Sequence, residues 1–87
     1  MKVNYEFVKR KIFDEYYLVP IGEAASKFGG IIAINEVSSF IFDCLTECEN
    51  AKDIAARLLE RYDTDEATAL SDTEEFLTAL REQGIIG

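Results

Sequence analysis

The sequence IIAIN (Ile31–Asn35) runs directly into EVSSFIFDCL (Glu36–Leu45), and this junction decides the fold of the chain. The first part is a short run of apolar, mostly β-branched residues, which predicts a strand over Ile31–Ile34. The second part has apolar residues at helical spacing, which predicts an amphipathic helix over about Glu36–Leu45. Asn35 stands between them, where its side chain is suited to accept a hydrogen bond from the first helical turn. A small sheet is therefore expected to lie directly against helices.

Two further strands are predicted before this junction. Phe7–Phe13 is a basic segment interrupted by apolar residues, and Tyr16–Ile21 is rich in aromatic and β-branched residues. Asp14-Glu15 between them predicts a tight turn. Pro20 has no N–H to donate to a ladder, which places it near a strand end or at a sheet edge.

The segment Gly22–Gly30 is predicted to be a loop in which Ala24–Lys27 forms one helical turn. Gly29-Gly30 allows the chain to bend before the strand Ile31–Ile34. An apolar strand at a sheet edge leaves backbone groups free to recruit another chain. A central strand, paired on both sides, is the alternative interpretation of the same residues.

Two more helices are predicted after the junction. One runs from about Ala51 to Tyr62 with Asn50 as its N-cap, and its buried face is expected to comprise Ile54, Ala55, Leu58, Leu59 and Tyr62. The other runs from Asp65 or Glu66 to about Gln83, and Gly84 then supplies a left-handed C-terminal position. Because the strands come first and the helices follow, the chain is predicted to be of the α+β class.

The last helix carries two overlapping stripes of side chains. The first is sufficient to anchor the helix and comprises Leu70, Thr73, Leu77 and Leu80. The second is small and semi-polar and comprises Ala69, Asp72, Phe76, Ala79 and Gln83. This second stripe is interpreted either as the wall of a groove or as part of a wider buried face.

The charge of the chain is distributed unevenly. Residues 1–30 carry five basic and four acidic side chains, whereas residues 31–87 carry four basic and thirteen acidic ones, for a net charge of -8. This acidity disfavours binding to nucleic acid and polybasic attachment to a membrane. The 87 residues are expected to form one domain over residues 1–87. No apolar run approaches the length of a membrane span, and a cytoplasmic protein is expected.

The residues that catalysis commonly needs are largely missing. The chain has no histidine, no glycine-rich phosphate loop and no calcium-binding loop. Cys44 is interpreted as a core residue and Cys48 as lying past the end of its helix. A zinc site needs further ligands, and a disulfide is not expected without a secretory signal. The sequence predicts no catalytic residue, no metal and no cofactor, so an enzyme is not expected.

Taken in order, several of these pieces resemble the pyrroloquinoline quinone biosynthesis protein D (PqqD) family. Its members include recognition elements of pathways that make ribosomally synthesised, post-translationally modified peptides (RiPPs). The pieces that carry the resemblance are the strand ending in Asn35, the helix Val37–Leu45, Asp53-Ile54-Ala55 leading to Leu58, Leu59 and Tyr62, Phe76-Leu77-Thr78-Ala79-Leu80, and Gly84-Ile85-Ile86. The chain departs from the family pattern at Thr46-Glu47-Cys48-Glu49, where members usually have a Gly, and in the length of Gly22–Gly30.

The resemblance implies a winged-helix-like fold, in which a three-stranded antiparallel sheet is followed by three helices. It also implies a non-catalytic peptide chaperone that binds the leader segment of a RiPP precursor peptide as an extra strand beside Ile31–Ile34. The expected partners are that precursor peptide and a modifying enzyme. The enzyme is often a radical enzyme that uses S-adenosylmethionine and iron–sulfur clusters (a radical SAM enzyme), and the clusters belong to the enzyme.

The peptide-binding residues expected from this mechanism lie on the third strand, the loop before it and the last helix. They are Phe28, Ile31, Ile32, Ala33, Ile34, Asp72, Glu75, Phe76, Ala79 and Gln83. Asp72, Glu75 and Glu82 are the acids expected to meet basic leader residues, and solubility is an alternative reason for their charge. Successive strand residues alternate in direction, so the sequence leaves open which face of the strand lines the groove.

Two other functions stay open at this point. A winged-helix regulator is disfavoured because the last helix is acidic rather than basic. A dimerising accessory subunit would pair with a second copy through the same strand edge, so the homodimer is an alternative to peptide binding.

Overall fold

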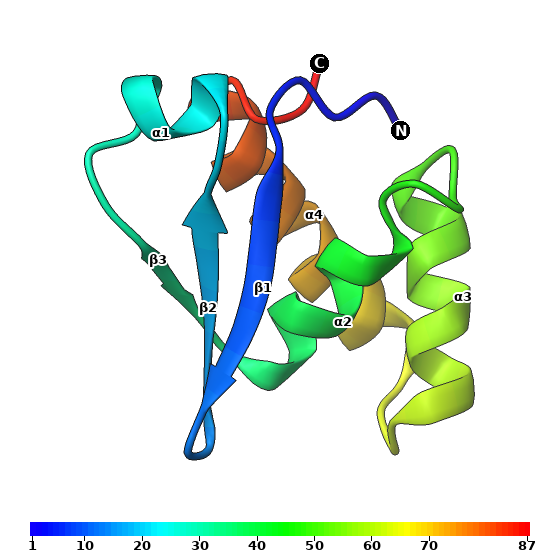
Figure 1. Cartoon of the computed structure of the whole chain (residues 1–87). Coiled ribbons are helices and arrows are strands. Elements are labelled where there is room, and N and C mark those ends of the chain that lie inside the picture. The colour runs from blue at the N-terminus through cyan, green and yellow to red at the C-terminus, as the bar shows by residue number, and fades with distance from the viewer.

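Figure 1 shows the computed structural model of the chain, which describes all residues 1–87. Its elements follow in the order β1 (Phe7–Ile12), β2 (Glu15–Pro20), α1 (Glu23–Lys27), β3 (Ile32–Ile34), α2 (Glu36–Cys44), α3 (Ala51–Arg61) and α4 (Glu66–Glu82). The strands form one antiparallel sheet, and α2, α3 and α4 form a helical layer on one side of it. The predicted α+β class and the helical turn before β3 are confirmed. None of the helices combines the length and the apolar character needed to cross a membrane.

β2 is the central strand of the sheet, with β1 on one side and β3 on the other. Leu18 of β2 lies opposite both Lys9 of β1 and Ile32 of β3, so these side chains share one face. Leu18 is completely buried, which identifies this face as the one that packs on the helices. β3 pairs only with β2, so the prediction of an edge strand is confirmed and the central-strand alternative is wrong. Ile31 lies outside β3, because pairing with β2 begins only at Ile32.

Each of the three longer helices begins with a side-chain cap. Asn35 Oδ1 accepts a hydrogen bond from the Ser38 N–H at 2.7 Å, at the predicted junction of strand and helix. Asn50 caps α3 in the same way, and Asp65 caps α4 by accepting from the Thr68 N–H at 2.7 Å. That N–H stabilises the carboxylate and lowers the pKa of Asp65. These caps fix the helix starts at the positions that the sequence predicts.

The hydrophobic core lies between α2, α3, α4 and the C-terminal segment. Its buried members are Ile41, Cys44, Leu45, Cys48, Ile54, Ala55, Leu58, Ala69, Leu77, Leu80, Ile85 and Ile86. The prediction that Leu59 is buried is wrong. Leu59 is 37% exposed because α3 buries the neighbouring Ile54, Ala55 and Leu58 instead. Ala69 of the semi-polar stripe is buried in the core, so at this residue the alternative of a wider buried face holds.

α4 ends at a left-handed residue, as predicted. Gly84 has a φ of 75°, which glycine adopts without steric cost. The Gly84 N–H donates to the Arg81 carbonyl, and the Ile85 N–H donates to the Leu80 carbonyl. This pair of bonds is the Schellman motif, and it turns the chain so that Ile85 and Ile86 are buried.

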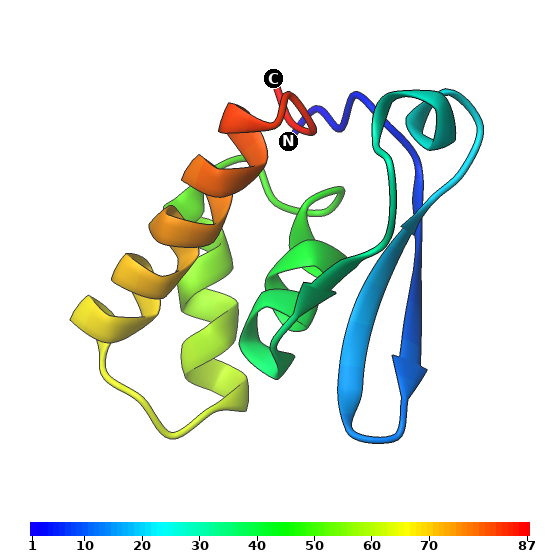
Figure 2. The same cartoon turned by 90° about the vertical axis from the view of Figure 1, so that its left-hand side faces the viewer.

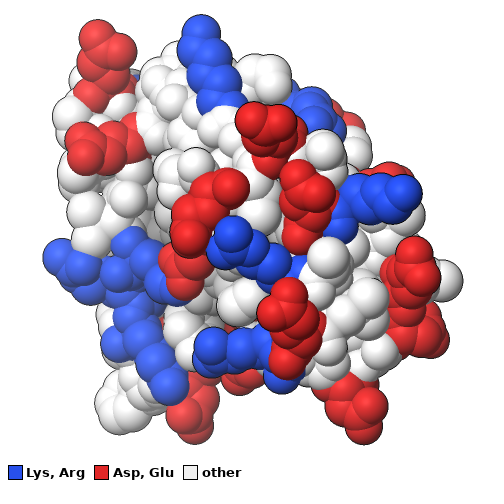
Figure 3. Space-filling model, turned by 90° about the vertical axis from the view of Figure 1, so that its right-hand side faces the viewer, with Lys and Arg blue, Asp and Glu red and all other residues white.

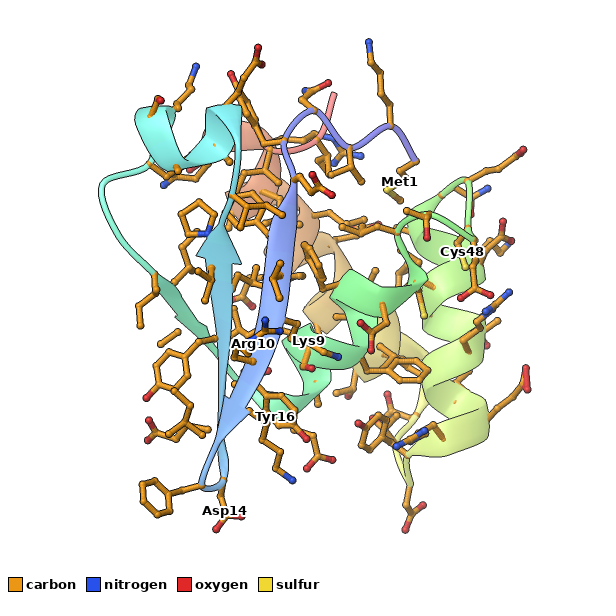
Figure 4. The ribbon with its side chains drawn as sticks, viewed as in Figure 1. Met1, Lys9, Arg10, Asp14, Tyr16 and Cys48 are labelled. Carbon is orange, nitrogen blue, oxygen red and sulfur yellow. The ribbon has the colours of Figure 1, made fainter.

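The turn after α2 closes without the glycine of the family pattern. The N–H groups of Glu47 and Cys48 both donate to the Cys44 carbonyl. Cys44 and Cys48 are free thiols. Cys44 is buried in the core and Cys48 lies past the end of α2, both as predicted, but Cys48 is also buried, which the sequence did not indicate. The Met1 ammonium donates to the carbonyls of Leu45 and Cys48, at 2.7 and 2.6 Å, so the first residues lie against this turn (Figure 4).

The turn between β1 and β2 differs from the prediction. The sequence predicts a turn at Asp14-Glu15 with Phe13 in the strand, but Ile12 pairs with Glu15 and the turn residues are Phe13 and Asp14. Phe13 has a φ of 57° and its side chain is 93% exposed. A positive φ at the first central residue alone is typical of a type II′ hairpin turn, in which glycine is favoured. The hairpin therefore holds an aromatic residue where backbone geometry favours glycine.

Asn50→Ala is expected to lower the free energy of unfolding by about 1 kcal/mol, because the Asp53 N–H loses its acceptor. Urea denaturation followed by circular dichroism measures the change. Asn50→Asp is the matched control, since aspartate keeps the acceptor and should leave the stability nearly unchanged. Equal losses in the two variants would contradict the capping role.

Phe13→Gly is expected to raise the free energy of unfolding by about 0.5–1 kcal/mol, because relief of the strained backbone outweighs the added freedom of the unfolded chain. Asp14→Gly is the control: Asp14 is not among the positive-φ residues, so glycine there adds only unfolded-state entropy and should destabilise. The same urea titration compares them, and a less stable Phe13→Gly variant argues against this turn geometry.

Candidate functional site

A groove with a volume of about 680 Å³ lies along the free edge of β3, between that strand and α4. Figure 2 looks onto this side of the molecule, where β3 lies in front of α2. The lining residues are Lys27, Phe28, Gly29, Gly30, Ile31, Ile32, Ala33, Ile34, Asn35, Ser38, Phe76, Ala79, Leu80, Gln83 and Ile85. Most of them are hydrophobic, which is typical of a binding groove.

The floor of the groove is formed where β3 faces α4. Ile32 and Ile34 point to the helical side of the sheet and are half-buried. Phe76 is half-buried on α4, and the fully buried Leu80 and Ile85 lie beneath the groove. The floor therefore consists of partly exposed apolar side chains that pack on buried core residues.

The other two apolar residues of the segment Ile31–Ile34 lie toward solvent. Ala33 pairs with Tyr17 and points to the opposite face of the sheet from Ile32. Ile31 is 57% exposed and lies where the chain enters β3. Both reach the groove at its rim rather than at its floor.

A second hollow, with a volume of about 360 Å³, continues the groove along α4. The residues common to both hollows are Asn35, Ser38, Phe76 and Ala79. The second hollow adds Val37, Asp72 and Glu75, so the continuous groove ends in carboxylates beside the start of α2. Lys27 lines the groove on the other side, before β3 begins. The groove therefore has an apolar middle, an acidic end and a basic end.

Aromatic contacts hold the basic end in place. The Phe28 ring packs edge-on against Tyr5, with 5.3 Å between ring centres, and lies 5.4 Å from the ring of Phe7. The Lys27 ammonium lies 5.4 Å from the centre of the Tyr5 ring. These contacts tie the end of α1 to β1 and to the residues before it, so this part of the groove is positioned by packing.

All ten residues proposed from the sequence lie along these two hollows. Those in the first hollow are Phe28, Ile31, Ile32, Ala33, Ile34, Phe76, Ala79 and Gln83. Asp72 and Glu75 line the second, whereas Glu82 lines neither. The lining residues outside the proposed ten are Lys27, Gly29, Gly30, Asn35, Val37, Ser38, Leu80 and Ile85. Ser38 could have been predicted to line the groove, because it lies close in sequence to Asn35 at the end of the predicted edge strand. The apolar spacing of Leu80 predicted only that it is buried in the core.

The side of the molecule that bears α3 carries mixed charges (Figure 3). Lys9 and the Asp43 carboxylate lie 2.5 Å apart and join β1 to α2, and Arg57 lies 3.3 Å from Glu47. In Figure 4, Lys9 and Tyr16 project from the sheet toward α2. These two ion pairs join charges of both signs within the protein, and no apolar strand edge lies on this side.

The titratable groups near the core do not favour covalent chemistry. Burial raises the pKa of the Cys44 thiol, which disfavours the reactive thiolate. Burial and the neighbouring Glu36 carboxylate raise the pKa of Tyr62. Neither side chain lines the groove. What the groove offers is apolar surface, a free strand edge and terminal charges, which together suit non-covalent binding.

Comparisons with known proteins agree with this architecture. A solved structure of TbiB1 in complex with the TbiA(beta) leader peptide has 24% sequence identity and a TM-score of 0.71, covering 99% of this chain and 94% of that chain. Lasso peptide synthetase B1 complexed with the leader peptide has 18% identity and a TM-score of 0.70, covering 97% and 93%. Both likenesses concern the fold. No curated protein matches the chain. Residues 15–86 match the profile of Coenzyme PQQ synthesis protein D, and the chain therefore belongs to the PqqD family.

Proposed function

We propose that this chain is a non-catalytic peptide chaperone, a single domain over residues 1–87 that binds the leader segment of a RiPP precursor peptide. The leader adds as a strand beside β3 and is presented to an enzyme that modifies the precursor. The observation that carries the proposal is the free apolar edge of β3 beside a groove. The two similar structures, TbiB1 and lasso peptide synthetase B1, are complexes with leader peptides, which supports the same role here.

The two edges of the sheet differ in what they offer to an added strand. β1 carries Lys9, Arg10 and Lys11, and charged residues on an edge strand oppose pairing with another chain. β3 has no charged residue, and Ile32 and Ile34 already hold it against the helices. Its unpaired N–H and C=O groups supply affinity with little demand on the leader sequence. The leader is therefore expected at β3.

Selectivity then comes from leader side chains that point into the groove. Successive residues of an added strand alternate in direction, so every second leader residue faces Phe76 and Ala79 of α4. Full burial of one leucine-sized side chain contributes about 1.5–3 kcal/mol. A leader with apolar residues at alternate positions therefore fits this groove.

The charges at the two ends of the groove determine which order of basic and acidic residues along the leader is favourable. Every strand pair in the sheet is antiparallel, and antiparallel pairing is slightly more stable per residue. An antiparallel leader enters beside Asn35, near Asp72 and Glu75, and leaves toward Lys27. Basic residues before the apolar section and acidic residues after it complement this arrangement. Each such exposed pair contributes about 0–1 kcal/mol, so the pairs select among leaders more than they hold them.

In this proposal the chemistry belongs to the partner enzyme. A radical SAM enzyme is the expected partner, and a cytoplasmic location is part of the same proposal. Pairing of two copies through β3 uses the backbone groups that the leader needs. A homodimer of that kind would therefore compete with leader binding.

A backbone amide NMR titration with the leader of the precursor peptide encoded nearest to this chain tests the proposal. Shifts are expected to concentrate in Phe28–Asn35 and Asp72–Gln83, because these segments line the groove. A control leader with proline at the positions that pair with β3 should bind about tenfold more weakly, since proline has no N–H to donate. Shifts confined to α3, or their absence at millimolar leader, would count against strand addition.

Phe76→Ala is expected to weaken leader binding by about 10- to 50-fold, because the groove loses its largest α4 contact. Isothermal titration calorimetry on the folded variant measures the effect. Phe40→Ala is the matched control, since Phe40 is also half-buried but packs on Tyr62 outside the groove. It should lose stability without losing affinity. Equal affinity losses in the two variants would mean that Phe76 acts only through stability.

Glu75→Lys is expected to weaken binding of a leader with N-terminal basic residues by up to about fivefold, and less so at high salt. Glu74→Lys makes the same charge change one residue away, outside both hollows, and should leave the affinity nearly unchanged. Calorimetry at two salt concentrations compares them. Identical responses would show that net charge, rather than position along the groove, decides the effect.

A further inference from the structure

The face of the sheet that points away from the helices is unexpectedly apolar. In an antiparallel sheet with one solvated face, the outward residues are normally polar. Here the strand register directs outward Val8, Arg10, Ile12, Glu15, Tyr17, Val19 and Ala33. We call these residues, together with Phe13 at the hairpin tip, the outer face. Only Arg10 and Glu15 among them are charged.

No helix covers this outer face, and β2 and β3 lie uncovered toward the viewer in Figure 2. Ile12 is 52% exposed and Phe13 is 93% exposed. Core packing does not account for either residue, and backbone geometry favours glycine at Phe13. Contiguous exposed apolar surface of this kind is typical of a protein–protein interaction site.

The polar groups of the outer face leave one free cation. Glu15 accepts a hydrogen bond from the Tyr17 hydroxyl at 2.5 Å, so that carboxylate is engaged. The Arg10 guanidinium donates to the Lys9 carbonyl at 3.2 Å and makes no ion pair. Lys11 follows Arg10 but points to the opposite face, where its ammonium lies 5.5 Å from the centre of the Tyr16 ring, so Arg10 is the one unpaired cation of the outer face. A complementary surface therefore has an apolar hollow for Phe13 and carboxylates at its margin.

We infer that the outer face docks the peptide-modifying enzyme, through an apolar hollow edged with carboxylates. The inference rests on the proposed function, because an added leader strand extends the sheet beyond β3 and directs every second side chain to this same face. A protein seated there contacts the chain and the bound leader together. The enzyme that acts on the peptide is the partner for which this double contact is useful, since it binds the loaded chain more tightly than the empty one.

The test uses a face variant that carries Ile12→Thr, Phe13→Gly and Val19→Thr. Threonine keeps strand propensity, and glycine suits the turn, so the variant is expected to fold. Leu59→Gln is the control, because Leu59 is a similarly exposed apolar residue on α3. The probe is the peptide-modifying enzyme encoded beside this chain, immobilised for surface plasmon resonance with and without leader. The face variant should bind the enzyme about tenfold more weakly and keep its affinity for the leader. The Leu59→Gln control should bind the enzyme as tightly as the wild type.

Several outcomes overturn the inference. Equal enzyme binding by the wild type and the folded face variant does so, as does failure of the wild type to bind the enzyme. Sedimentation velocity that finds a wild-type dimer and a monomeric face variant assigns the surface to a second copy instead. Binding of the wild type alone to phosphatidylglycerol vesicles assigns it to a membrane. Failure of the wild-type chain to bind the leader refutes the proposed function instead. The leader titration measures that binding separately from binding of the enzyme.

Discussion

The pairing of Leu18 with Ile32 is the contact on which the other features depend. Leu18 is completely buried, so the strand that pairs with it is held against the helices. Asn35 follows β3 directly and caps α2, so the register of β3 also sets where that helix begins. A slip of one residue would turn Ile32 and Ile34 outward and displace the cap. The register of β3 therefore determines both where α2 begins and which side chains form the groove floor.

Local signals in the sequence predicted the helices well. Asn35, Asn50 and Asp65 cap their helices through contacts within three residues, and apolar spacing reveals the buried stripes without any tertiary information. The strand ends were harder to predict, because cross-strand pairing decides them. Phe13 continues a strand-like segment, yet the pairing of Ile12 with Glu15 places it in the turn.

Groove residues that lie on a single strand or helix could be predicted from the sequence. Those that reach the groove only when several elements pack together could not. The semi-polar stripe around Phe76 and the apolar β3 are visible in the sequence. The contribution of Ile85 depends on the turn at Gly84, which folds the chain back under α4. The outer face was equally hidden, since alternation alone suggests that Val8 points inward and Lys9 outward. The structure has the reverse, because the strand register places Lys9 opposite the buried Leu18, and Lys9 then reaches past the core to pair with Asp43.

β3 is only three residues long, follows two exposed glycines and has a neighbour on one side. A strand with so few contacts opens locally at low cost, so its amide protons exchange with solvent sooner than those of the core. In the proposed complex the peptide would make β3 an interior strand, and part of the binding free energy would be spent on ordering it. On the proposed function, this cost would lower the affinity for each peptide, while an edge strand that adjusts its fit would accept peptides that differ in sequence.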